Sequence, residues 1–194
     1  MNIFDYLNIN GHVTIHKVLD NGTEELLYDD HNVIVSGFGV GLSHFFALSG
    51  STKIYDYQID RFQLGLSGAT SLEVSSRFQL SSALTSVNQY TTTGLGDILA
   101  VTGNQIKNGS VVGGEIFAKI PFHHVTRISE SSVRYTLRID KDSCNGLALK
   151  EVGLFMKNPR GLTPDASILV AYKSFSEIKK TSDFALIIRW TINL

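Results

Sequence analysis

Two stretches in the C-terminal half of the chain alternate strictly between apolar and polar residues. Val133, Tyr135, Leu137 and Ile139 are the apolar members of the first stretch, and Phe184, Leu186, Ile188, Trp190 and Ile192 are those of the second. Neighbouring side chains of a β-strand point to opposite faces, so a period of two indicates a half-buried strand. Both stretches therefore predict strands with one face on a core, and Trp190 is assigned to that face.

The N-terminal part predicts a β-hairpin. Val13 and Ile15 alternate with polar neighbours, and Asn21-Gly22 separates them from a second apolar stretch at residues 26–28. Asn and Gly tolerate the left-handed dihedrals of a tight turn, which places the turn at this pair.

A further strand and a short helix are predicted after the hairpin. The strand covers residues 32–35, and the helix covers residues 38–48. We expect the helix to be capped at Ser36 or just after and to stop near Gly50. The run at residues 168–172 predicts another strand, with Ile168, Val170 and Tyr172 on one face.

Short strands separated by turns favour an all-β protein over alternating βαβ units. The chain is predicted to be one domain, residues 1–194, folded as a mainly antiparallel β-sandwich with one short helix. Residues 81–114 are rich in Ser, Thr, Gly and Asn. A flexible loop or hairpin insertion is therefore expected around residues 85–114.

Composition and charge argue against several classes of function. Lys and Arg number 17 against 18 Asp and Glu, so the net charge is −1, whereas a protein that binds phosphate backbones is normally basic. A single cysteine leaves no intrachain disulfide framework and no cysteine-based zinc site. No apolar run approaches the ~20 residues that span a bilayer, and no basic, apolar leader opens the sequence. We therefore expect synthesis in a cytoplasm, with no nucleic-acid or membrane partner.

Two histidine pairs are the candidates for a metal site. His123 and His124 are adjacent, so on a strand their imidazoles point to opposite faces and cannot easily share one ion. His12 and His16 share a face on a strand or a helix, but no carboxylate cluster accompanies them in the sequence. Structural roles are therefore favoured for both pairs, and no metal site is expected.

Two patterns near the predicted helix are incomplete as catalytic or cofactor motifs. Ser43-His44 lacks the Gly-x-Ser-x-Gly turn of a nucleophile elbow. Gly37-x-Gly39-x-Gly41 lacks the G-x-G-x-x-G spacing of a dinucleotide loop, and no βαβ unit follows it. Neither pattern therefore predicts a site.

The polar residues of the C-terminal strands are also interpreted as structural. Arg134 and Arg138 share the polar face of one strand with Lys141 close by, which indicates a solvated face in preference to a phosphate groove. Cys144 lies in a predicted turn and is expected to be a reduced thiol. The sequence thus predicts no catalytic, cofactor-binding or metal-binding residues and no cofactor.

An ordered series of short motifs runs through most of the chain. L-K-E-V-G-L-F at 149–155 is followed by I-L-V-A at 168–171, F-S-E-I-K-K at 175–180 and R-W-T-I at 189–192. Nearer the start, N-V-I-V at 32–35 precedes a glycine-rich helix, and F-Q-L-G-L-S-G occupies 62–68. This order of motifs resembles a family of tailed-bacteriophage virion proteins, of the tail, baseplate and fibre-associated kind.

The resemblance implies a non-enzymatic structural subunit of a virion, made in the host cytoplasm, that acts as a tail or baseplate adaptor or fibre-attachment protein. Its partners would be other virion proteins, and it would form a homo-oligomer in a symmetric assembly. A neck, collar or capsid-decoration protein is an alternative within this class. A carbohydrate-binding β-protein is the alternative from another class, with Tyr55, Tyr57 and Tyr90 as exposed sugar platforms.

Glu151 is the first residue of the E-x-G-L-F motif at 151–155. A partly buried carboxylate needs a basic or backbone partner, and Lys179, Lys180 or Arg189 is expected to supply it. Gly153 is expected to let the strand bend or pack closely.

Overall fold

The computed structural model describes residues 9–47, 57–66, 111–112, 115–116, 118–120, 124–142, 144–157 and 167–194. Its elements are the strands β1 (Asn10–Val18), β2 (Glu24–Ile34), β3 (Ile59–Gly65), β4 (Val111–Val112), β5 (Glu115–Ile116), β6 (Ala118–Lys119), β7 (Val125–Arg127), β8 (Ser132–Ile139), β9 (Ala148–Lys157), β10 (Ser167–Lys179) and β11 (Ala185–Asn193), and the helix α2 (Ser36–Phe46). Among these strands, nine form one antiparallel sheet in the order β6-β3-β9-β10-β2-β1-β11-β8-β7. The predicted all-β, mainly antiparallel fold with a short helix is confirmed.

The sheet curls until its two halves face each other. Strand β2 pairs with β1 along residues 24–32 and with β10 at Val33 and Ile34, so it belongs to both halves. The rings of Phe62 in β3 and Trp190 in β11 lie 6.1 Å apart, although four strands separate β3 from β11 in the sheet. One core therefore fills the space between the halves, but two separate sheets, as in the predicted sandwich, are not confirmed.

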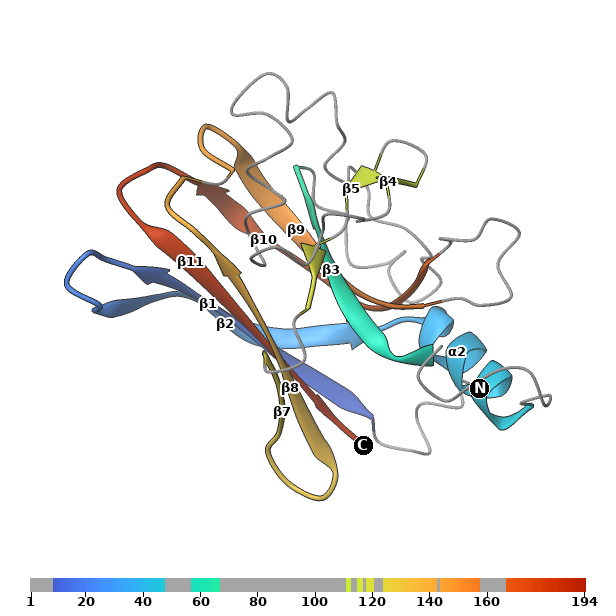
Figure 1. The fold of residues 1–194 in the computed structure, drawn as a ribbon. Helices are drawn as coiled ribbons and strands as arrows, with labels where there is room; N and C mark the ends of the chain where they lie inside the picture. Colours follow the sequence, from blue (N-terminus) through green and yellow to red (C-terminus); the bar gives the residue numbers. More distant parts are fainter. Residues whose placement is uncertain are drawn as a thin grey trace.

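Helix α2 lies at one end of the fold, away from the β1–β2 hairpin (Figure 1). It begins at Ser36, and its N-cap is Val35, which makes no side-chain cap hydrogen bond; the predicted cap at Ser36 is therefore wrong. A Cβ atom at Gly37 would overlap the carbonyl oxygen of Leu169, and one at Gly41 would overlap the side chain of Met156. The helix thus uses glycine where it packs closely against β10 and β9.

Strand β2 is longer than predicted. Residues 26–28 and 32–35 were expected to be separate strands, but β2 is continuous from Glu24 to Ile34. The turn before it is confirmed, because Gly22 has φ +81° and Leu19 N–H donates to Thr23 O at 3.0 Å. The pairing with β1 shifts between Ile15 and His16, so Leu27 is the extra residue of a bulge.

A second bulge changes the faces of β10. Leu169 pairs with Phe155 and Ala171 with Leu154, which leaves Val170 as an extra residue. Ile168, Val170 and Ala171 belong to the main core, whereas Tyr172 does not. The prediction that Tyr172 shares a face with Ile168 and Val170 is therefore wrong, because the bulge reverses the alternation between them.

The predicted insertion at residues 85–114 lies mostly outside the described residues. Within it, Val111–Val112 forms β4, which pairs with β5. The other predicted strands agree with the structure: Tyr135, Leu137 and Ile139 are buried on β8, and Leu186, Ile188, Trp190 and Ile192 are buried on β11.

Where β2 joins β10, polar contacts hold the two strands together. Lys173 Nζ donates to Asp30 Oδ2 at 2.7 Å and to the His31 carbonyl oxygen at 2.6 Å. The bond from Lys173 and that from the His31 backbone N–H lower the pKa of Asp30 from 3.8 to about 2. Because the pKa of Asp30 is lower in the folded state than in the unfolded state, its ionised form stabilises the fold at pH values above the unfolded-state pKa. This stabilisation is lost as the pH falls from about 5 to about 2.

Trp190→Ala is expected to lower the free energy of unfolding by about 3–5 kcal/mol, because Trp190 is 0% exposed and packs beside Phe62. Thr191→Ala is expected to cost within about 0.5 kcal/mol, because Thr191 lies on the opposite, half-buried face. Urea unfolding followed by far-ultraviolet circular dichroism measures both. Equal losses would contradict the assignment of faces on β11.

Asp30→Asn is expected to lower the free energy of unfolding at neutral pH. It should also weaken the dependence of that free energy on pH between about pH 5 and pH 2. The change should be about 1 kcal/mol or less, because the Asp30 carboxylate is half exposed. Lys173→Met removes the partner and should flatten the same part of the profile. Urea midpoints measured across this pH range test both variants, and a wild-type profile in both would contradict the role of this ion pair.

Candidate functional site

The outward face of β1, β11 and β8 carries a continuous set of polar side chains. We call this the polar face and define it by His12, Thr14, His16, Arg134, Arg138, Arg189 and Thr191. Alternation produces it, because the residues between these positions point into the core. The antiparallel register then places Thr191 between His12 and Arg134 across the sheet.

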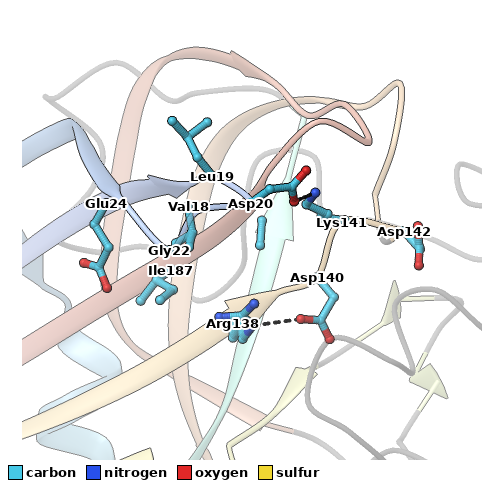
Figure 2. Close-up of a pocket in the computed structure, with 11 residues that line it drawn as sticks. Val18, Leu19, Asp20, Gly22, Glu24, Arg138, Asp140, Lys141, Asp142 and Ile187 are labelled. Atoms are coloured by element: carbon cyan, nitrogen blue, oxygen red, sulfur yellow. Dashed lines mark hydrogen bonds and ion pairs between the residues drawn. The ribbon is translucent and has the colours of Figure 1, made fainter.

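Two neighbouring hollows lie along the polar face. One has a volume of about 410 Å³ and is lined by six of the seven residues of the polar face, Arg138 being the exception. The other, of about 530 Å³, lies where the β1–β2 turn meets the end of β8. Figure 2 shows acidic and basic side chains around this second hollow, with Lys141 reaching Asp20 and Arg138 directed at Asp140.

Arg189 and Glu24 form a bidentate ion pair on the polar face. The guanidinium Nη1 and Nη2 atoms donate to Glu24 Oε2 and Oε1, each at 2.8 Å. These bonds lower the pKa of Glu24 and raise the pKa of Arg189. His16 Nδ1 lies 3.6 Å from Glu24 Oε2, so the Glu24 carboxylate lies between the Arg189 guanidinium and the His16 imidazole.

His12 has its own carboxylate partner. Its Nε2 atom lies 2.5 Å from Asp29 Oδ1, and its ring meets the His31 ring edge-on at 5.6 Å between centroids. The structure thus brings His12 and His16 onto one face as predicted, but each contacts a different carboxylate. Within the described ranges, no three His, Cys, Asp or Glu side chains are grouped as metal ligands.

The predicted cationic side chains of β8 also lie on the polar face, and each has a partner. Arg134 Nε donates to Thr191 Oγ1 at 3.3 Å, and Arg138 Nε donates to Asp140 Oδ1 at 2.8 Å. Mixed charges in contact favour binding through polar hydrogen bonds over the capture of a strong anion. The polar face can therefore contact a polar surface of another molecule.

The remaining candidates from the sequence lie apart from the polar face. His124 is half buried beside β7, and Cys144 is buried with φ +60° in the turn after β8. Ser43 Oγ donates to the Val40 carbonyl oxygen within its own helix. The placement of His123 and the side chain of His44 lie outside the described residues.

The E-x-G-L-F motif lies on β9, between β3 and β10. Glu151 is 0% exposed, and Tyr172 OH donates to its Oε2 at 2.7 Å. Gly65 lies opposite Glu151, and a Cβ atom there would overlap the Glu151 side chain. Gly153 lies between Gln63 on β3 and Tyr172 on β10 in the register of the sheet.

Two cations expected to pair with Glu151 bind other groups. Lys180 is buried, and its ammonium donates to Lys141 O, Asn145 Oδ1 and Thr181 O at 2.6–3.0 Å. Arg189 binds Glu24 on the polar face. The sequence prediction is therefore wrong for Lys180 and Arg189. Oxygen atoms of the neighbouring turns surround the Lys180 ammonium, and Arg189 lies on the outward face of β11, away from β9.

Gly65→Ala is expected to lower the free energy of unfolding by about 1–3 kcal/mol, because the new methyl group overlaps Glu151. Glu151→Ala should remove that overlap, so the double variant should lose less stability than the sum of the single variants. A double-mutant cycle from urea unfolding measures the coupling. Strict additivity would contradict a direct contact between the two side chains.

No described helix has the length and apolar character needed to cross a bilayer. Comparisons with protein-family models, curated proteins and solved structures find no match for this chain.

Proposed function

We propose that this chain is a non-enzymatic structural subunit of a bacteriophage virion, acting as a tail or baseplate adaptor or a fibre-attachment protein. The observation that carries the proposal is that motifs which resemble the tailed-bacteriophage family lie on neighbouring strands. Residues 62–65 on β3, 151–155 on β9 and 168–171 on β10 are neighbours in one antiparallel unit. Segments that are separate in the sequence thus have one shared structural role.

The chemistry of this unit supports a structural role in preference to catalysis. A catalytic carboxylate must reach a substrate, whereas Glu151 is fully buried and Tyr172 occupies one of its oxygens. Gly65 is the small residue that gives the Glu151 side chain its space. The polar groups of the motif therefore fix the spacing of three strands.

The partners that we propose are other virion proteins and further copies of this chain in a symmetric assembly. The polar face supports this proposal because its charges are balanced in pairs, as in Arg189–Glu24 and Arg138–Asp140. A surface of this kind suits the polar contacts of a subunit interface. A neck, collar or capsid-decoration position remains the alternative within the virion class.

The carbohydrate-binding alternative is weakened at one of its three aromatic residues. Tyr57 was expected to be exposed, but it is only 6% exposed and cannot present its ring as a sugar platform. Tyr55 and Tyr90 lie outside the described residues. No contact among the described side chains favours this alternative over the virion proposal.

Particles of the phage that encodes the chain are expected to contain it in a fixed copy number at the tail or baseplate. Quantitative mass spectrometry of gradient-purified particles measures the copy number, and electron microscopy with gold-labelled antibodies locates it. A nonsense mutation in its coding sequence should yield particles without complete tails or fibres. Label on the head would instead support the decoration alternative, and absence from particles would overturn the proposal.

A glycan array with the purified chain separates the virion proposal from the carbohydrate alternative. We expect no specific glycan signal from the wild-type chain. Specific binding to one glycan class, in a chain that is absent from particles, would support a carbohydrate-binding protein instead.

A further inference from the structure

Strands β2 and β10 pair at their junction and then separate. Within the described residues, their pairing consists of Ile34 with Ala171 and Val33 with Tyr172. The cause is a bulge in β10. Ser174 pairs with Glu151 and Ile178 pairs with Leu149, so β10 advances by four residues where β9 advances by two. This bulge turns the rest of β10 away from β2.

Aromatic side chains fill the space where the separation begins. The Tyr28 side chain spans it, because its hydroxyl donates to the Ser174 carbonyl oxygen at 3.3 Å. The Tyr28 ring packs on the Phe175 ring, with 5.7 Å between centroids. Tyr28 and Phe175 therefore close one end of the space between the strands.

Beyond this closed end lies a groove of about 370 Å³. Its lining includes Leu27 from β2, residues 176–179 from β10, and Phe184 and Lys17. Phe184 belongs to the main core and Ile178 packs against that core, so the groove has an apolar floor. Leu27 is 43% exposed at its rim.

The backbone of β2 presents free positions along this groove. Leu19 N–H donates to Thr23 O at 3.0 Å, which makes these two residues a hydrogen-bonded pair of the hairpin. In an antiparallel ladder, such pairs alternate with pairs whose backbone groups point away. The register of Glu24 with Val18 and of Leu26 with His16 therefore turns the N–H and C=O of Glu24 and Leu26 away from β1.

The backbone of β10 presents matching positions from the other side. Lys180 N–H donates to Leu147 O at 3.0 Å, and Lys180 O accepts from Gly146 N–H at 2.9 Å. The same alternation turns the N–H and C=O of Lys179 away from β9, toward the groove. Two strand edges thus border one apolar groove.

We propose that this groove accepts a short extended segment of another protein, which completes the sheet as a strand between β2 and β10. Facing strand edges recognise an extended backbone, and the apolar floor takes alternate side chains of the segment. That the protein which supplies this segment is a virion subunit rests on the proposed function, but the preference of the groove for an extended segment does not.

The charges at the groove favour a segment with an acidic side chain. Lys17 pairs with Glu25, and Glu177 pairs with Lys150. Among the described residues, the exposed Lys179 has no ion-pair partner, so its ammonium is available to a carboxylate. The occupant is therefore an acidic, alternating segment.

A strand of a second copy is a poorer occupant than a free segment. The occupant must pair along both of its edges, whereas β2 of another copy already has β1 along one edge. The same holds for β8 and β11, which pair with each other. A segment that enters the groove must therefore be unpaired before it binds.

The test is a selection of short random peptides displayed on yeast against the purified wild-type chain. Selected peptides should alternate apolar with polar residues and be enriched in Asp or Glu. On binding the corresponding synthetic peptide, the amides of Leu26 and Lys179 should become protected from hydrogen exchange, as measured by nuclear magnetic resonance.

Two matched pairs of variants test the two parts of the proposal. Leu26→Pro removes a groove-side N–H without removing a bond to β1, and should weaken peptide affinity about tenfold or more, while Leu26→Thr should leave it unchanged. Lys179→Gln should weaken the binding of acidic peptides, while Lys179→Arg should preserve it. Circular dichroism checks that all four variants are folded.

The outcomes distinguish this inference from the proposed function. A selection that yields no peptide, protection elsewhere in the chain, or equal affinity for Leu26→Pro and Leu26→Thr would overturn the groove proposal. Self-association in sedimentation velocity that Leu26→Pro abolishes would assign the edge to a second copy and overturn it too. Neither result changes the expected position of the chain in the particle.

Discussion

Both halves of the sheet depend on β2, because this strand changes partners along its length. Eight of its first nine residues pair with β1, the bulged Leu27 being the exception, and its last two pair with β10. The change of partner lets the sheet curl, so Phe62 on one half meets Trp190 on the other. The core between the halves therefore depends on the short junction at Val33 and Ile34, which Lys173 and Asp30 reinforce.

Bulges control the geometry on either side of that junction. The bulge at Val170 turns Tyr172 away from the main core and toward Glu151. The bulge between Ser174 and Ile178 then moves β10 away from β2. The two bulges of β10 thus have different effects: the first brings Tyr172 to the buried Glu151, and the second opens the groove between β2 and β10.

The parts of the fold that could be predicted are those with uninterrupted alternation. Leu186, Ile188, Trp190 and Ile192 alternate without a bulge, so their period of two determined their face correctly. The alternation around Tyr172 was misleading, because an extra residue reverses every side chain after it. No residue type in the run at 168–172 marks that extra position, and the register of β9 is needed to find it.

The candidate site was predictable to a similar extent. The placement of His12 with His16, and of Arg134 with Arg138, follows from their even spacing on strands. The carboxylate partners of His12 and His16 do not follow from that spacing, because Asp29 and Glu24 come from β2, and the bulge at Leu27 sets the register of Asp29 with β1. The prediction that Lys180 pairs with Glu151 was wrong for a related reason. Backbone carbonyl oxygens of Lys141 and Thr181 accept from its ammonium, and every residue type carries such an acceptor, so the sequence does not identify them.

An open strand edge is normally a hazard, because it invites pairing with any extended chain. Proteins limit this hazard with charged side chains, and β2 carries Glu24, Glu25, Asp29 and Asp30 along its exposed part. Each of these carboxylates already contacts a basic side chain, whereas Lys179 at the groove has no ion-pair partner among the described residues. The unpaired ammonium of Lys179 thus adds to a preference that the backbone already sets: strand pairing favours a free segment over a second copy, and the charge admits an acidic segment to the groove.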